Sequence, residues 1–288
     1  MGIRLNDIDE ATWDVTIAPR QGLLDLGLED LWRFRDLVRL LAYRNYMVNY
    51  RQTVLGPLWY VVQPLMTTAI FTMVFKFIGA LPTDGIPAVL FYLSGIVVWS
   101  NFATNLMSTS DVFVANIGLF GKVYFPRLTV PIATVLTNLI ALVVHLALFL
   151  LMYLLWILWG AEARPSLWMI CCPLLFGVNI AMALGVGLSV SALTTRYRDL
   201  ASMLGSVVQL WMYASPLFYP LSQIPERWRL LMALNPVSTM IEIFRYMAFG
   251  KGTFSAYSIE ISLMVVVFTF ASGLLLFRRA ELIAADTV

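Results

Sequence analysis

Long apolar stretches alternate with short polar ones along most of the chain, from Leu55 to Phe277. A helix needs about 20 consecutive apolar residues to cross a hydrocarbon layer of ~30 Å. Stretches of that order occur at about 55–75, 87–106, 128–159, 167–193, 200–217 and 255–277. The pattern therefore predicts an all-α integral membrane protein with six transmembrane helices. The third stretch is long for one span, so it must tilt, protrude or break.

The segment between the fifth and sixth stretches is apolar on both sides of Asn235-Pro236, but each half is too short to cross a membrane. We interpret residues 221–249 as a re-entrant hairpin of two gate helices that enters from the outer face, with a folded cap on that face as the alternative. Glu242 and Arg245 are three residues apart, a spacing at which helical side chains pair. The residues assigned to this outer gate are Pro220, Asn235, Pro236, Glu242 and Arg245.

Residues 29–50 have an amphipathic pattern, with apolar side chains on one helical face and arginines on another. That pattern is typical of a helix lying in the membrane interface. We therefore expect a cytoplasmic segment at 1–28, followed by a single transmembrane domain at 29–288 that begins with this interface helix. Acidic residues occupy the region where a cleavable signal needs a basic start and an apolar core, so the first span is expected to act as an uncleaved insertion signal.

The distribution of Lys and Arg predicts the orientation of the spans. Short loops rich in these residues stay in the cytoplasm. Thirteen of the nineteen Lys and Arg residues belong to the N-terminal segment, the second and fourth loops and the tail, and six belong to the opposite side. We therefore expect both termini to lie in the cytoplasm.

The composition excludes several classes of protein. Of the 288 residues, 60% are hydrophobic and 12% are charged, and the mean hydropathy is +0.81. Soluble proteins average about 45–50% apolar and about 25% charged residues. The net charge of +2, with no basic stripe, argues against nucleic-acid binding. The length leaves room for one membrane bundle and no second soluble domain.

Catalytic and metal-binding patterns are not recognisable in the sequence. The string from Gly118 to Lys122 lacks the spacing and the hydroxyl of a phosphate-binding loop, so the chain is not expected to hydrolyse ATP. His145 has no second metal ligand nearby in the sequence, which favours simple hydrogen bonding over a metal site or a proton relay. The adjacent Cys171 and Cys172 point to different sides of a helix and are not expected to form a disulfide. We expect neither an enzyme nor a cofactor bound by this chain.

Aromatic residues are abundant, with nine Trp, twelve Tyr and eighteen Phe. Several of them lie deep in the predicted spans or towards the cytoplasmic side, where their ring faces can stack on sugar rings. Packing within the bundle is the alternative for any single ring. The residues assigned to such a substrate path are Trp59, Tyr60, Trp99, Phe102, Trp211 and Tyr213.

Small residues recur every four positions in the fourth span. Residues at this spacing lie on one helical face and let a neighbouring helix approach closely. The sequence therefore predicts a tight helix contact along Gly177, Ala181, Gly185 and Ser189.

Five motifs occur in order over about residues 31–279. Together they resemble the membrane subunit of ATP-binding-cassette exporters of cell-surface polysaccharide, of the O-antigen, capsule or teichoic acid type. The motifs are Tyr50-Arg-Gln-Thr-Val-Leu-Gly-Pro-Leu-Trp59 with Gln63-Pro64, Lys122-Val-Tyr-Phe-Pro-Arg127, Arg196-Tyr-Arg-Asp199, Ser215-Pro216 and Leu234-Asn-Pro236.

The resemblance implies a homodimer of six-span subunits in the bacterial inner membrane, with lipid-linked polysaccharide exported between the two protomers. Each protomer would bind a separate ATPase subunit, which would hold ATP and Mg²⁺. The residues expected to couple to that ATPase are Arg35, Arg39, Asn116, Phe120, Tyr124, Arg196, Arg198 and Asp199. A lipid diphosphate would pair near the cytoplasmic interface with arginine and lysine side chains, whose alternative role is to set the orientation. These residues are Arg44, Arg51, Lys122 and Arg127.

Other functions remain as alternatives. A drug or lipid efflux permease of the same architecture would differ only in its cargo. A membrane-embedded glycosyl or acyl transferase would turn over a sugar or acyl donor without a partner. An ion-coupled transporter is disfavoured, because such proteins use carboxylates inside the membrane and acidic residues are nearly absent from the predicted spans.

Overall fold

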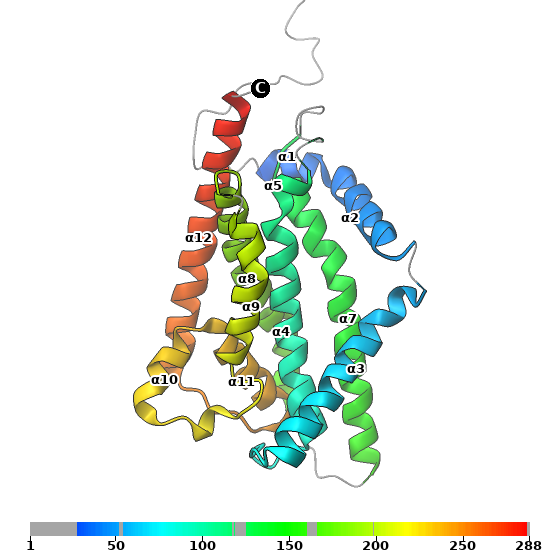
Figure 1. Ribbon diagram of the computed structural model, residues 1–288, viewed down its shortest axis with the longest axis vertical. Coiled ribbons are helices and arrows are strands. Elements are labelled where there is room, and N and C mark those ends of the chain that lie inside the picture. Colours follow the sequence, from blue (N-terminus) through cyan, green and yellow to red (C-terminus); the bar gives the residue numbers. More distant parts are fainter. Residues whose placement is uncertain are drawn as a thin grey trace, which may run out of the picture.

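The computed structural model describes residues 28–51, 54–116, 118, 125–159, 166–197 and 199–286. All regular elements in these ranges are helical, in agreement with the predicted fold class. Figure 1 shows the long helices running in one general direction, with short helices gathered at each end. The longest are α4 (Ala88–Ser110), α7 (Thr129–Leu158), α8 (Cys172–Thr194) and α12 (Ala256–Asp286).

Five helices in the described ranges are long and apolar enough to cross a membrane, and they coincide with five of the six predicted spans. The first, Gly56–Ile78, consists of η3 (Gly56–Leu58), α3 (Trp59–Phe71) and the π-helical turn η4 (Thr72–Ile78). The fourth starts with η5 (Leu167–Cys171) and continues as α8. The unbroken α7 has 30 residues and is therefore ~45 Å long.

The predicted span at 200–217 is wrong as a single helix. The structure has α9 (Asp199–Tyr213) there, whose 15 residues reach only ~22 Å. The chain then turns through Ser215-Pro216, because a residue that precedes proline is disfavoured in the helical conformation. The part of the chain that the structure describes thus has five full-length helices and one short helix at the fifth predicted span, and the six-span count is not confirmed.

Helix α4 forms the centre of the bundle. Most of its residues are buried, including Phe91, Leu93, Val97 and Phe102. In contrast, few residues of the helix at Gly56–Ile78 and of α12 are buried, and both helices carry many exposed apolar side chains. Since water does not solvate such surfaces favourably, these outer faces are suited to lipid or to another protein.

Helices α8 and α12 pack closely, as the small residues of the fourth span predict. A Cβ atom on Gly185 would lie 2.6 Å from the backbone nitrogen of Phe270, and one on Gly273 would overlap the carbonyl of Gly185. Gly177 has nothing within 4 Å of its Cβ position, so the close contact is centred on Gly185.

The predicted interface helix is two helices, α1 (Leu28–Arg33) and α2 (Arg35–Tyr50), which run obliquely at one end of the bundle (Figure 1). The apolar face of α2 is buried at Val38 and Leu41, which belong to the same cluster as Val130 of α7. α2 is therefore held by the bundle.

The segment predicted to form the hairpin contains two short helices at the opposite end of the bundle (Figure 1). After the turn η6 (Leu221–Gln223), the exposed α10 (Glu226–Ala233) is joined at Leu234-Asn235 to α11 (Pro236–Phe249). Most of α11 is buried, and it ends at Gly250, whose φ of +65° favours glycine. A re-entrant position in the membrane remains a proposal.

Candidate functional site

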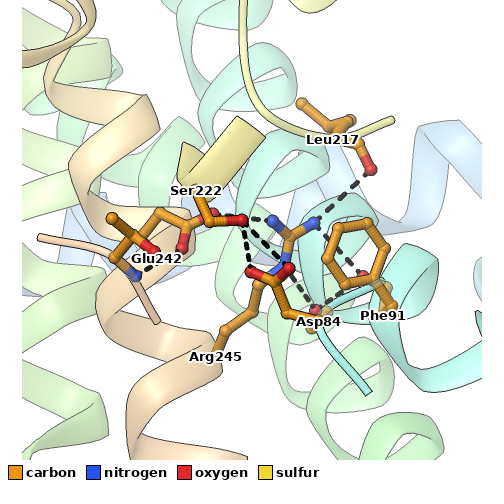
Figure 2. Close-up of polar contacts among 8 residues, drawn as sticks. Asp84, Phe91, Leu217, Ser222, Glu242 and Arg245 are labelled. Atoms are coloured by element: carbon orange, nitrogen blue, oxygen red, sulfur yellow. Dashed lines mark hydrogen bonds and ion pairs between the residues drawn. The ribbon is translucent and has the colours of Figure 1, made fainter. Parts of the chain in front are cut away.

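A buried ion pair between Glu242 and Arg245 lies inside the hairpin end of the molecule (Figure 2). Arg245 Nη1 donates to Glu242 Oε1 at 2.9 Å, and the two side chains are 1% and 2% exposed. The backbone nitrogen of Thr253 donates to the second carboxylate oxygen of Glu242 at 2.9 Å. The predicted pairing of these two residues is therefore confirmed.

Neighbouring elements surround the guanidinium of Arg245 (Figure 2). Its Nη2 donates to the carbonyl oxygens of Phe91 and Leu217, and its Nε donates to Ser94 Oγ, each at 3.4 Å. Its carbon Cζ lies 3.6 Å from the centre of the Phe91 ring, which adds a cation–π interaction. Because a buried charge needs such partners, Arg245 fixes α11 against α4 and the turn at Leu217.

Two contacts at the edge of this cluster connect the α3–α4 loop to the hairpin region. Ser222 Oγ lies 2.9 and 2.8 Å from the two carboxylate oxygens of Asp84, and Lys251 Nζ donates to the carbonyl of Gly85 at 3.0 Å. Both contacts are exposed. Sequence reasoning missed them, because partners more than 130 positions apart leave no local signal.

The remaining residues of the predicted outer gate lie near the start of α11. Asn235 Nδ2 donates to Ser215 Oγ at 2.9 Å, which connects this helix to the turn after α9. Pro236 occupies the first helical position, where a missing N–H costs least. Pro220 is buried just before η6. The gate residues thus form two groups. One is the buried pair of Glu242 and Arg245, and the other consists of Asn235 and Pro236 at the start of α11 and Pro220 before η6.

The predicted aromatic path residues do not share one surface. Trp99 is 6% exposed and Phe102 is fully buried, and both belong to the core. The Phe102 ring packs on Trp211 at 5.0 Å between centroids. Trp59 and Tyr213, in contrast, are 45% and 51% exposed. Tyr60 is half-buried, with its ring centroid 6.3 Å from that of His145.

Helix α9 exposes a polar stripe. Only Leu204 and Val208 are buried among the residues of α9. Ser202, Ser206, Gln209 and Tyr213 are all exposed, and their spacing of four, three and four residues places them together on the face opposite those two. In membrane helices, polar residues normally face the bundle interior or a water-filled cavity. This face of α9 points away from its own bundle.

The cationic residues assigned to a lipid diphosphate are not gathered in one place. Arg44 and Arg51 are exposed, and Arg44 donates to Asn45 Oδ1 at 3.2 Å. Arg127 is half-buried before α7. Burial lowers the pKa of its guanidinium, and the nearby Glu281 carboxylate opposes that change. Lys122 lies outside the described residues.

Of the described residues assigned to ATPase coupling, all but the half-buried Asn116 are exposed. Arg35 packs over Trp32, and Arg39 pairs with Asp36 at 3.3 Å. Asn116 Nδ2 donates to the carbonyl of Val112 at the end of α5 (Val112–Ala115). The structure does not describe three of the assigned residues, Phe120, Tyr124 and Arg198. It describes Arg196 and Asp199, which are both exposed.

A ladder of asparagines crosses the bundle and was missed by sequence reasoning. Asn138 donates to Asn105 at 3.2 Å, Asn105 to Asn101 at 3.1 Å, and Asn101 to Asn179 at 2.8 Å. Asn179 in turn donates to the Met240 sulfur on α11 at 3.4 Å. Asparagines inside apolar spans were the available signal, because such residues seek partners within the bundle.

His145 lies beside this ladder, in a small pocket that also includes Asn101 and Asn138. Among the described residues, no group of His, Cys, Asp and Glu is arranged to hold a metal ion. Cys171 and Cys172 are free thiols, in agreement with the prediction.

These features define a multi-pass helical membrane protein whose polar residues form two internal networks and one outward stripe. Residues 36–249 match the ABC-2 type transporter family, and the chain belongs to that family.

Several curated proteins are similar to this chain over most of their length. The O-antigen export system permease protein RfbA of Klebsiella pneumoniae is 26% identical over 250 residues, which cover 85% of this chain and 92% of the relative. The protein of the same name from Myxococcus xanthus is 25% identical over 220 residues, covering 76% and 82%. The polysialic acid transport protein KpsM of Escherichia coli is 23% identical over 249 residues, covering 85% and 93%.

Proposed function

We propose that this chain is the transmembrane subunit of an ATP-driven exporter that moves lipid-linked, O-antigen-like polysaccharide from the cytoplasm across the inner membrane. Membership of the ABC-2 type transporter family supports the transport role. Relatives named for O-antigen and polysialic acid export support a polysaccharide cargo over the drug or lipid efflux alternative.

The observation that carries this proposal is the polar stripe of α9. A row of hydroxyl, amide and phenol groups facing acyl chains would leave hydrogen bonds unmade, which costs free energy. The same groups facing a water-filled path would bond to water or to sugar hydroxyls. The exposed ring of Tyr213 at the end of the stripe stacks on Phe218, which fixes its orientation. The stripe is therefore suited to line a route for sugar chains.

A second copy of the chain would close this route. One protomer presents the stripe on its outside, so a path lined by it needs a facing surface. Trp59 and Gln63 are also exposed and lie four residues apart on α3, which adds a second aromatic and polar surface. We infer a homodimer in which the stripes of two protomers face a shared path.

The hairpin region would gate the outer end of that path. It is joined to the turn after α9 through Asn235 and Ser215, so a movement of α9 reaches α11 directly. The buried Arg245 connects α11 to α4. We infer that the hairpin shifts together with the turn at Ser215-Pro216, as a hinge-like closure at the ends of elements.

The energy would come from separate ATPase subunits at the cytoplasmic end. The exposed Arg35, Arg39, Arg196 and Asp199 lie on that end and supply charges for docking. ATP and Mg²⁺ would be bound by those partners, and their closure would move the docked helices. Both termini would lie on this side, as the Lys and Arg distribution indicates.

A deletion and complementation experiment tests the proposal. Cells without this chain should retain lipid-linked polymer inside, and the wild-type chain should restore it to the surface. Ser202→Leu/Ser206→Leu/Gln209→Leu, which removes the polar groups of the stripe, should insert normally but fail to restore export. Met203→Leu/Val207→Leu/Leu210→Met on the same helix is the matched control and should export normally.

Two results would contradict the proposal. Normal surface polymer in the deletion strain, together with altered drug tolerance, would assign the chain to efflux. Full export by the triple leucine variant would contradict the polar stripe of α9 as the lining of the path, and with it the observation on which the proposal rests.

A further inference from the structure

Arg278 has unpartnered hydrogen-bond donors at the end of α12. Its Nη1 donates to Glu281 Oε2, one turn further along the helix. Its Nε and Nη2 are buried and have no hydrogen-bond partner, and the whole residue is 7% exposed. A buried donor without an acceptor costs free energy, so an acceptor is expected to be supplied from outside the described residues.

The two unpartnered donors, which are buried, lie on the same edge of the guanidinium. The Nε–H and one Nη2–H bond of arginine point in parallel, and this edge accommodates two oxygens of one phosphate or carboxylate. Glu281 occupies a different nitrogen, so it leaves this edge available. The arrangement thus specifies an oxyanion with two acceptor oxygens.

The surroundings of Arg278 favour an anion at the head of an apolar chain. A shallow pocket beside it is lined by Arg127 and Glu281 together with the apolar Leu128, Leu274 and Phe277. Among the lining residues that the structure describes, two arginines and one glutamate give a net positive charge. Because its remaining walls are apolar and α12 reaches it from within a candidate span, the pocket suits an amphiphile that lies in a membrane.

We propose that Arg278, assisted by Arg127, binds the phosphate group of a membrane lipid between the start of α7 and the end of α12. The phosphate accepts both hydrogen bonds from the Nε–Nη2 edge, and the acyl or prenyl chain lies along Leu274. The proposal requires only that the chain lies in a membrane, so it stands or fails separately from the polysaccharide cargo.

Native mass spectrometry of lipids retained by the purified full-length chain tests the site. Nanodiscs of phosphatidylcholine with about a fifth of phosphatidylglycerol provide the anionic probe, and pure phosphatidylcholine provides the blank. Arg278→Gln should lower the retained phosphatidylglycerol by about tenfold, because it removes a charge-assisted pair of hydrogen bonds. Arg279→Gln removes the same charge from an exposed neighbour and should retain the lipid like the wild type.

Two further variants separate lipid binding from a purely structural role. Glu281→Gln should increase retention, because it frees Arg278 Nη1 and removes the opposing charge. If Arg278 and Glu281 formed only a structural ion pair, either Arg278→Gln or Glu281→Gln would weaken that pair, and neither would increase lipid retention. Should Arg278→Gln fail to fold, Arg278→Lys keeps the charge but loses the two-donor edge, and it should show a loss of several-fold.

A competition arm identifies the source of the phosphate. Displacement of phosphatidylglycerol by undecaprenyl diphosphate at lower concentration would assign the site to a prenyl carrier, and no displacement would assign it to phospholipid. Equal retention by Arg278→Gln and Arg279→Gln would overturn the proposal.

Discussion

Gly185 of α8 and Gly273 of α12 face each other so closely that neither position has room for a methyl group. The two helices therefore touch through their backbones. Close approach of this kind replaces side-chain packing with many short backbone contacts, which is favourable between membrane helices. The contact leaves no space between α8 and α12 at this crossing.

Alanine at Gly185 or Gly273 should force α8 and α12 apart and lower the free energy of unfolding by about 1–3 kcal/mol, the usual cost of overpacking. Thermal unfolding of the purified chain in detergent measures the change. Gly177→Ala on α8 is the matched control, because its Cβ would meet no atom within 4 Å. Equal melting temperatures for Gly185→Ala and Gly177→Ala would contradict a backbone contact at this crossing.

Breaking the buried pair should destabilise the hairpin region strongly. Arg245→Met leaves Glu242 buried without its cation, and we expect a loss of about 3–5 kcal/mol. Glu242→Gln/Arg245→Met removes both charges and should recover much of that loss. The unfolding free energies of the two single variants and the double variant give the coupling energy.

The exposed pair Arg229 and Glu226, 3.7 Å apart on α10, is the control for this cycle. Its removal should cost no more than about 1 kcal/mol, as for other surface pairs. A loss of similar size at both pairs would show that burial does not strengthen the Glu242–Arg245 contact.

Two of the three tryptophans predicted to line the path, Trp59 and Trp99, should behave differently. Trp99→Leu leaves a gap in the core and should lower the free energy of unfolding by roughly 2–3 kcal/mol. Trp59→Leu changes a 45% exposed side chain and should alter it by no more than about 0.5 kcal/mol. If Trp59 lines the path, its variant should nevertheless reduce surface polymer. Normal export by folded Trp59→Leu would limit that residue to lipid contact.

The contact between Asp84 and Ser222 should hold the α3–α4 loop against the hairpin region. Asp84→Ala removes the surface hydrogen bond that Ser222 donates to the Asp84 carboxylate, a change worth about 1 kcal/mol. Amide hydrogen exchange at residues 80–86 and 221–224 should become about fivefold faster, with little change in α4. Glu226→Ala, which removes an exposed carboxylate on α10, should leave both segments unchanged. Unaltered exchange in Asp84→Ala would show that the loop is held by other contacts.

Local patterns in the sequence were sufficient for much of the fold. The long apolar stretches predicted all five of the long helices that can span a membrane, the three-residue spacing predicted the pairing of Glu242 with Arg245, and the small residues predicted the contact at Gly185. Each of these depends on neighbours along one helix or on composition alone.

Other features depend on the path of the chain through space. Hydropathy continues past α9 into Leu217 and Phe218, so it did not show that the helix ends before Ser215-Pro216. The contact between Asp84 and Ser222 joins segments 138 positions apart. Trp99 is buried and Trp59 is exposed, because Trp99 lies on the central helix α4. The residue type, which is the same at both positions, could not predict this difference.

Because α9 ends at Tyr213, it extends along only part of the length of the bundle. Along one part of that length the bundle presents the polar stripe of α9. Along the other part it presents α10, α11 and the turn between them. A solute moving along α9 would first meet a surface that can replace its hydration, and afterwards one built around a buried charge. Slow passage is thus to be expected at the junction of these two surfaces, near Asn235 and Ser215.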